Sequence, residues 1–408
     1  MLWSDRYLPS FDPQRGAPRM PFKDEIVAAV DRLSSKLIAT SRFLHLHPEL
    51  AYEERESSRH LTSLLKAHGF EVVEGVGGLP TAFVASAGVD HPSATIAFLA
   101  EYDALPSLGH ACGHNLIATS SIGAAMALQP SLPMLGGRVL VIGCPAEEKG
   151  GGKIALVKAG LFANVSAALL VHPSNRTEIF KSALAMRALK VEFFGKASHS
   201  AAAPHLGINA LDAVVLSFTN LNALRQQLRQ DARIHGIITD GGLAPNIIPD
   251  YAAARFCIRA LDLEYLHDLQ RRVVACFEAA AQATGATVAI HEEGEEYHPM
   301  QCNRALGTLF RVNLEALGER VEQTPEDQDL GSTDVGNVSQ VVPTLQPTIA
   351  LTDQLDVVCH STAFAEAAGG PAGDRAILIA AKALAMTAVD LFTDPATLRQ
   401  VQEEFQWA

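Results

Sequence analysis

Four short segments of this sequence carry side chains of the types that can bind zinc. They are Asp103, the Cys112-Gly113-His114 segment, the Glu147-Glu148 pair and His172. Thiolate, imidazole and carboxylate are the usual zinc ligands in proteins. Each segment alone has an ordinary explanation, since a glutamate pair is often solvated and a histidine before a proline can simply cap a strand. Because several such segments fall within about 70 residues, their coincidence predicts a metal site.

The two adjacent glutamates predict the reaction. One member of the Glu147-Glu148 pair can bind metal in its ionised form, while the other can accept the proton of a metal-activated water. A bound metal lowers the pKa of water to about 7, so a carboxylate can act as base at neutral pH. Two metals about 3.5–4 Å apart can also stabilise the oxygen that becomes negative. A cysteine such as Cys112 suits this site because metals keep its thiol deprotonated.

The surrounding pattern predicts the elements that position these side chains. Uniformly apolar runs at 95–100, 138–144 and 167–171 predict strands covered on both faces, and a helix is expected at 116–128. Strands that alternate with helices indicate an α/β sheet with crossovers. In such sheets, sites assemble beyond the carboxyl ends of the strands, where the candidate ligands fall. A helical pattern also covers 22–68, with a turn at His47-Pro48.

The pattern changes near residue 180. The expected elements there are strand 188–194, helix 210–230, strands 234–239 and 252–258, helix 263–284 and strand 287–292. This order is the ferredoxin-like β-α-β-β-α-β signature. The α/β character returns after residue 300, with helices at 303–317 and 373–391. We therefore expect a catalytic domain formed by 22–179 and 300–408, an inserted domain at 180–299, and a flexible tail at 1–21.

Composition limits the functional classes. A chain of 408 residues with 48% hydrophobic and 19% charged residues is typical of a globular enzyme of about two domains. The net charge of -13 argues against nucleic acid or an anionic membrane as partner. We expect no membrane span and no signal peptide, and therefore a cytoplasmic protein. The six cysteines show no framework spacing and are expected to be free thiols or metal ligands.

Longer segments carry the pattern of a known family. They are FLHLHPELAYEE (43–54), AEYDALPSLGHACGHN (100–115), PAEEKGGGK (145–153), GKASHSAAAPHLGINALDA (195–213), HGIITDGGLAPNIIPD (235–250) and GSTDVGNVS (331–339). The chain resembles the dinuclear metallohydrolases that include carboxypeptidase G, aminoacylases and auxin-conjugate amidohydrolases. It is most similar to the aminobenzoyl-glutamate hydrolase and dipeptidase branch. The resemblance implies a zinc-peptidase-like α/β catalytic domain with an inserted ferredoxin-like dimerisation domain.

The resemblance also implies the composition of the metal site. The implied ligands are Cys112, His114, Glu148, His172 and His360. Cys112 would bridge two divalent metal ions, which we expect to be zinc, with manganese or cobalt as alternatives. Glu147 would be the general base, and Asp103 would orient a ligand. His360 depends almost wholly on the resemblance, because its own sequence context indicates little.

Three further residues are implied to contact substrate. His199 resembles a histidine that reaches the scissile carbonyl of the other subunit in a homodimer, and Asn246 resembles a substrate-binding asparagine. Arg259 is a candidate clamp for a carboxylate, although an arginine on an edge strand is often only solvated. The expected substrate is a dipeptide, an N-acyl amino acid or an aminobenzoyl-glutamate-type amide with a free carboxylate. The sheet edge of the inserted domain is the expected dimer surface.

Some positions depart from the family pattern. Many relatives place a histidine ligand where Glu101 stands, and the auxin-conjugate branch usually has aspartate where Asn115 follows Cys-Gly-His. We therefore expect Cys112 and His114 to provide the ligands here. His205 and His235 lie near matched motifs and are interpreted as structural or substrate-adjacent.

Two other functions remain open from the sequence. One is a homologue that keeps the metal-binding fold but acts only as a binding or regulatory protein. The other is a cysteine hydrolase that uses Cys112 with His114. Neighbours two residues apart on a loop do not easily form a nucleophile–base pair with a third orienting group, which disfavours the second.

Overall fold

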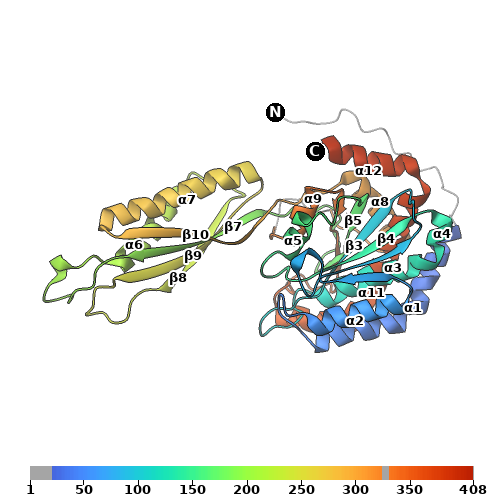
Figure 1. The fold of residues 1–408 in the computed structure, drawn as a ribbon, viewed down its shortest axis with the longest axis horizontal. Coiled ribbons are helices and arrows are strands. Elements are labelled where there is room, and N and C mark those ends of the chain that lie inside the picture. Colours follow the sequence, from blue (N-terminus) through green and yellow to red (C-terminus); the bar gives the residue numbers. More distant parts are fainter. Residues whose placement is uncertain (1–20, 324–329, 408) are drawn as a thin grey trace.

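The computed structural model describes residues 21–323 and 330–407. Figure 1 shows two bodies, a larger one that contains the first and last helices of the described chain and a smaller one that extends to the left. The expected flexible tail falls, apart from Pro21, outside the described residues. Pro21 is the first residue of helix α1 (Pro21–Leu46). Helix α2 (Arg55–Ala67) follows after a break, as the turn at His47-Pro48 predicts.

The larger body is built on a mixed six-stranded sheet in the order β1-β2-β4-β3-β5-β11. Its strands are β1 (Glu71–Glu74), β2 (Phe83–Gly88), β3 (Thr95–Glu101), β4 (Arg138–Cys144), β5 (Ala167–Leu169) and β11 (Thr344–Leu345). The last four run parallel to one another, whereas β1 and β2 form an antiparallel edge. The predicted α/β sheet is confirmed, and its parallel strands end at one common edge.

Alternate residues of the central strand β3 explain its uniformly apolar sequence. Ile96 and Phe98 pack in a core with helices α1, α3 (His114–Leu128), α8 (Arg304–Ala316) and α11 (Pro371–Thr393). Ala97 and Leu99 pack on the opposite face with α5 (Gly152–Lys158) and α9 (Val335–Ser339). All seven residues of β3 are buried, as expected for a strand covered on both faces.

Short helices complete the larger body. They are α4 (Leu132–Leu135), α10 (Thr362–Ala368) and α12 (Pro395–Trp407). Within the described part of the chain, α11 is the helix that is long and apolar enough to cross a membrane, but 72% of that stretch is buried inside the protein. Its contacts with α1 and α3 therefore account for its apolar sequence, as in the core helix of a soluble protein.

The smaller body has the predicted β-α-β-β-α-β order. Its elements are β7 (Ala185–Phe194), α6 (Ala210–Arg225), β8 (Arg233–Asp240), β9 (Tyr251–Ala260), α7 (Leu263–Thr284) and β10 (Thr287–Tyr297). The strands form an antiparallel sheet in the order β10-β7-β9-β8, and Val191 and Phe256 pack beneath both helices. Strand β8 is an edge on which Ile237 and Ile238 are exposed. The division at 180–299 remains a prediction.

One sequence-based placement is wrong in detail. The apolar run at 167–171 predicts a strand that ends at His172, but β5 ends at Leu169 and His172 begins a separate short strand, β6 (His172–Ser174). The pairing shifts on one side only: the pairing with β3 ends at Leu169, whereas His172 N still donates to Pro347 O at 2.9 Å, just as Leu170 N donates to Leu345 O. Strand β6 then pairs in parallel with β12 (Thr348–Ala350). This shift still leaves the His172 side chain at the carboxyl edge of the main sheet.

Candidate functional site

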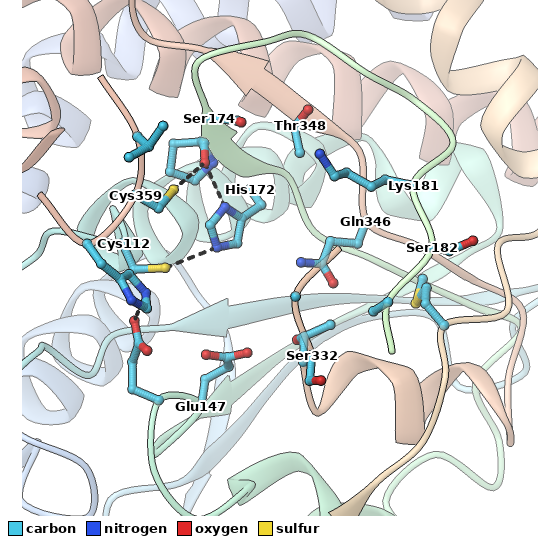
Figure 2. Close-up of a pocket in the computed structure, with 18 of the residues that line it drawn as sticks. Cys112, Glu147, His172, Ser174, Lys181, Ser182, Ser332, Gln346, Thr348 and Cys359 are labelled. Carbon is cyan, nitrogen blue, oxygen red and sulfur yellow. Dashed lines mark hydrogen bonds and ion pairs between the residues drawn. The ribbon is translucent and has the colours of Figure 1, made fainter. Parts of the chain in front are cut away.

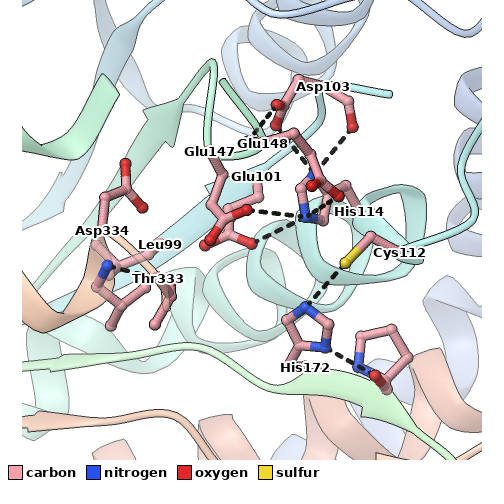
Figure 3. Close-up of polar contacts among 12 residues, drawn as sticks. Leu99, Glu101, Asp103, Cys112, His114, Glu147, Glu148, His172, Thr333 and Asp334 are labelled. Atoms are coloured by element: carbon pink, nitrogen blue, oxygen red, sulfur yellow. Dashed lines mark hydrogen bonds and ion pairs between the residues drawn. The ribbon is translucent and has the colours of Figure 1, made fainter. Parts of the chain in front are cut away.

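Side chains from five separate segments meet at the carboxyl edge of the parallel strands, and Figure 3 shows four of these segments, all except that of His360. Asp103 lies just beyond β3, the Glu147–Glu148 pair lies in the loop after β4, and His114 is the first residue of α3. His360 comes from the segment after β12, and its backbone N donates to the Ala111 O at 2.9 Å. That bond brings the late part of the chain next to Cys112.

Cys112 is common to two groups of potential metal ligands. It lies with His114 and His172 in one group, and with Glu148 and His360 in the other. In each group, the ligand atoms lie within 4.8 Å of one another. A single thiolate shared by two triads is the arrangement that a sulfur bridging two ions requires. A third group joins His114 to Glu147 and Glu148.

The spacing of ligand atoms fits tetrahedral ions. Metal–ligand bonds of about 2.0–2.3 Å place two ligands of one tetrahedral ion about 3.4–3.6 Å apart. Cys112 Sγ lies 3.5 Å from His172 Nε2, and Glu148 Oε1 lies 3.4 Å from His360 Nε2. These residues therefore fit two metal ions without rearrangement of the pairs.

Hydrogen bonds orient the imidazole of His114 toward the same point. Its Nδ1 donates to Asp103, and among the described residues its buried Nε2 has no hydrogen-bond partner. The other Asp103 oxygen, Oδ2, accepts from the backbone N of Glu148 at 2.9 Å. Asp103 belongs to none of the three ligand groups. It can thus orient two ligands at once without binding metal itself.

The centre has an excess of buried negative charge. The acidic groups are the carboxylates of Glu101, Asp103, Glu147, Glu148 and Asp334 and the thiol of Cys112, and Lys153 is the buried ammonium among them. Burial, with the charges of Glu101 and Asp334, raises the pKa of Glu147 well above its usual value. Burial lowers the pKa of His114, but the carboxylates of Asp103, Glu101 and Glu148 together more than reverse this effect. Two divalent cations would nearly balance the charge.

A cavity of about 780 Å³ opens from this centre (Figure 2). Cys112, Glu147 and His172 line one end, and Ser332 and Gln346 lie further along the wall. Cavities of this size enclose small organic ligands. The candidate base therefore faces a space large enough for a dipeptide.

The predicted substrate residues fall in two places. Arg259 lines the cavity, where its Nη1 donates to Ser332 Oγ at 3.1 Å and its buried Nε has no hydrogen-bond partner among the described residues. His199 and Asn246 are exposed at the opposite end of the inserted sheet and do not line the cavity. The backbone links their segments, because Ser200 N donates to Asn246 O. Their predicted roles remain predictions.

Three buried residues beside the centre were not predicted as site residues. Glu101 and Asp334 both form ion pairs with Lys153. The available signals were the lysine at the start of an apolar helix and an aspartate inside the GSTDVGNVS segment. Tyr297 was also missed, although its hydroxyl donates to the Glu147 backbone O at 3.1 Å. Nothing in its local sequence marks that contact.

This chain is similar to known proteins both in sequence and in fold. Residues 185–284 match the family of the peptidase dimerisation domain. The chain is 43% identical to Xaa-Arg dipeptidase of Mus musculus, with 92% of this chain and 90% of that protein covered. It is 32% identical to one of the subunits of p-aminobenzoyl-glutamate hydrolase of Escherichia coli, with 88% and 90% covered. A dinuclear metal-binding peptidase structure from Bacillus subtilis shares the fold, with a TM-score of 0.69, 22% identity and coverage of 89% and 99%.

Proposed function

Because this chain belongs to the M20 family of peptidases and is a metal-dependent dipeptidase or amidohydrolase, we propose that it cleaves the amide bond of a small substrate with a free carboxylate. The substrate is a dipeptide, an N-acyl amino acid or an aminobenzoyl-glutamate-type amide. One observation carries the proposal. A single cavity connects the candidate ligands and Glu147 with the guanidinium of Arg259, whose Nε is buried and has no hydrogen-bond partner in the described residues.

Each residue of the centre has a part in this reaction. Cys112 is shared by both ligand groups, His114 and His172 complete one group, and Glu148 and His360 complete the other. Two divalent ions, when bound, polarise the scissile carbonyl and lower the pKa of water. Glu147 takes the proton of the attacking water and delivers it to the leaving nitrogen. Asp103 keeps the His114 ring in position.

Arg259 is the proposed clamp for the substrate carboxylate. Its free Nε and its planar guanidinium can offer two parallel donors to a carboxylate. Since the higher sequence identity is to a protein named Xaa-Arg dipeptidase, we place dipeptides with a C-terminal arginine first among the candidate substrates. Aminobenzoyl-glutamate is the second candidate, from the relative in Escherichia coli.

The metal and the assembly belong to the same proposal. Thiolate and imidazole ligands favour zinc, with manganese or cobalt as alternatives. The match to a dimerisation domain and the exposed edge β8 support a homodimer. In such a dimer, His199 and Asn246 of one protomer complete the site of its partner. We also propose a cytoplasmic location, in keeping with six cysteines that form no disulfide in the described residues.

A substrate panel tests this function. Purified protein loaded with zinc or manganese is assayed with Ala-Arg, Ala-Glu, N-acetyl amino acids and aminobenzoyl-glutamate. The C-terminal amide of each dipeptide is the control. We expect hydrolysis of free-carboxylate substrates, much weaker hydrolysis of the amides, and complete loss of activity with a chelator. A metal-loaded dimer that hydrolyses nothing would favour the binding-protein alternative. Activity that resists chelation but not thiol alkylation would favour Cys112 as nucleophile.

A further inference from the structure

Lys153 is a wholly buried lysine beside the metal centre. Its Nζ lies 2.7 Å from Glu101 Oε1 and 2.6 Å from Asp334 Oδ1, and all three side chains are at most 1% exposed. Its backbone N also donates to the other oxygen of Asp334 at 2.9 Å. Asp334 therefore holds both the backbone and the side chain of Lys153. The three residues form a closed ionic cluster, the Glu101–Lys153–Asp334 triad.

The triad anchors the loop that carries the general base. Lys153 lies in the first turn of α5, directly after this loop. Backbone N groups of Gly151 and Gly152 both donate to Ala146 O, at 3.0 and 3.3 Å. Gly152 has no room for a side chain, because a Cβ there would lie 1.9 Å from the Pro145 O. The loop is thus closed on itself, and a fixed Lys153 also fixes the position of Glu147.

The other end of the triad belongs to the substrate side of the cavity. Asp334 directly follows Ser332 and Thr333, both of which line the cavity. Ser332 accepts the hydrogen bond from Arg259. The bonds between Lys153 and Asp334 therefore join the wall that carries the base to the wall that contacts the proposed carboxylate clamp.

Glu101 connects the same lysine to the ligand shell. While its Oε1 pairs with Lys153, its Oε2 lies 3.5 Å from His114 Nε2. Glu101 is not in any of the three ligand groups found in the described residues. The Lys153 ammonium thus connects three parts of the site. They are the loop that carries Glu147, the carboxylate of Glu101 beside His114, and the cavity wall that contacts Arg259.

We propose that Lys153 is a positioning residue for hydrolysis, which sets the distance between Glu147 and the substrate held at the Arg259 wall. The inference rests on the proposed function and adds a residue to it. A buried ion cluster by itself adds little stability, because desolvation of the charges offsets their attraction. The triad instead contributes by holding the reacting groups in position, since a displacement of about 1 Å at a reacting group can reduce a rate about 100-fold.

The test compares two lysines with similar partners. Lys153→Met removes the ammonium from the triad. Lys23→Met is the matched control, because Lys23 Nζ also contacts an aspartate and a second side chain, Asp390 at 2.6 Å and Asn313 at 2.8 Å, far from the cavity. We expect Lys153→Met to bind as much metal as the wild type, with kcat reduced about 10- to 100-fold and KM within about threefold. Lys23→Met should keep the wild-type kcat.

Two further variants keep the test decisive. Asp334→Asn retains an oxygen for the backbone N of Lys153 but loses the ion pair. This variant replaces Lys153→Met in the test if Lys153→Met does not fold. Its kcat should fall in the same way. Lys153→Met/Glu101→Gln removes the charge imbalance and should keep the low kcat. A wild-type kcat in folded, metal-loaded Lys153→Met or Asp334→Asn would overturn the proposal. So would recovery of kcat in the double variant, or a loss of kcat that only follows a loss of metal. An inactive wild type would instead overturn the proposed function.

Discussion

His114 is joined to Asp103 by two contacts: its Nδ1 lies 2.9 Å from both the Oδ1 and the backbone O of Asp103. Both partners are acceptors, so Nδ1 carries a hydrogen. The ring orientation is thereby fixed, and Nε2 faces the centre. A ligand that is oriented before metal arrives loses less rotamer freedom on binding. The pair therefore links a side chain that binds no metal to the affinity of the site.

The first prediction follows from this pair. In Asp103→Asn, a single amide oxygen cannot accept from both His114 and the Glu148 backbone, and metal affinity should fall about 10- to 100-fold. Competition with a chromogenic chelator measures the affinity. Asp390→Asn removes a partly buried aspartate that does not line the cavity, and should leave the affinity unchanged. Equal affinities in Asp103→Asn and the wild type would remove the orienting role.

Glu147→Gln tests the base. Glutamine has the size of glutamate but cannot accept the proton of water, so turnover should fall about 100- to 10,000-fold while metal remains bound. Metal content by mass spectrometry and kcat on the best substrate are the two readouts. Activity within a few-fold of the wild type would show that another group acts as base.

Metal stoichiometry separates the two ligand groups. Because Cys112 is shared by both groups and His360 belongs to one, Cys112→Ser should weaken both sites, whereas His360→Ala should leave about one ion per chain. The measurement is metal per chain after dialysis against a weak chelator. Retention of both ions by Cys112→Ser would argue against a bridging thiolate.

Arg259→Met tests the carboxylate clamp. If Arg259 holds the substrate carboxylate, KM should rise by a factor of about 10 or more, which corresponds to the loss of one charge-assisted hydrogen-bonded pair. Arg255→Met is the control, since Arg255 lies on the same strand but pairs with Glu293 and its side chain is 58% exposed. The amide substrates should respond less than the acids. Equal KM values for both variants would exclude the clamp.

The connection between the two bodies should be sensitive to acid. Burial alone would raise the pKa of Glu296, but hydrogen bonds from Arg187 and His267 bring it below its usual value. A carboxylate with a lowered pKa in the folded state stabilises the protein above its unfolded pKa, and loses that effect as pH falls through the folded pKa. Glu296→Gln should therefore reduce stability by about 1 kcal/mol at pH 7.

Urea unfolding of both proteins at pH 7, 5 and 3.5 checks this sign. The difference between wild type and Glu296→Gln should be complete at pH 7 and should shrink below about pH 4.5, the usual value for glutamate. Glu278→Gln on α7, an exposed glutamate, is the control. A difference that grows as pH falls would contradict the assigned direction.

The periodic spacing of apolar residues predicted the longer helices and strands, because that spacing reflects which side chains are buried. The helix at 263–284 has the predicted bounds, since Asp262 caps its start by accepting from Tyr265 N and Gly285 ends it with a φ of 78°. The short strands β6 and β11 have too few residues to show a period. Their place depends on backbone partners far away in the sequence, such as Pro347 for His172.

The convergence of the candidate ligands could be predicted, because strand ends in one sheet converge. His360 could not, because a backbone bond to Ala111 positions it and the local sequence carries no sign of that bond. Lys153 was missed for a different reason. A lysine that follows a glycine-rich loop is normally solvated, and only the packing of Glu101 and Asp334 around it shows that it is buried.

The two strands that connect the smaller body to the larger one are neighbours in its sheet. The chain leaves the larger body through β7 and returns through β10, and Met186 pairs with Tyr297. The smaller body therefore leaves and re-enters the larger body at neighbouring points, as a short surface loop does. Its insertion adds little loop-closure entropy to the folding of the larger body. Its length and sequence can diverge without a change in the register of the six-stranded sheet. Evolution can thus alter the assembly, and the side chains that the smaller body offers to substrate, while the positions of the candidate metal ligands in the larger body stay the same.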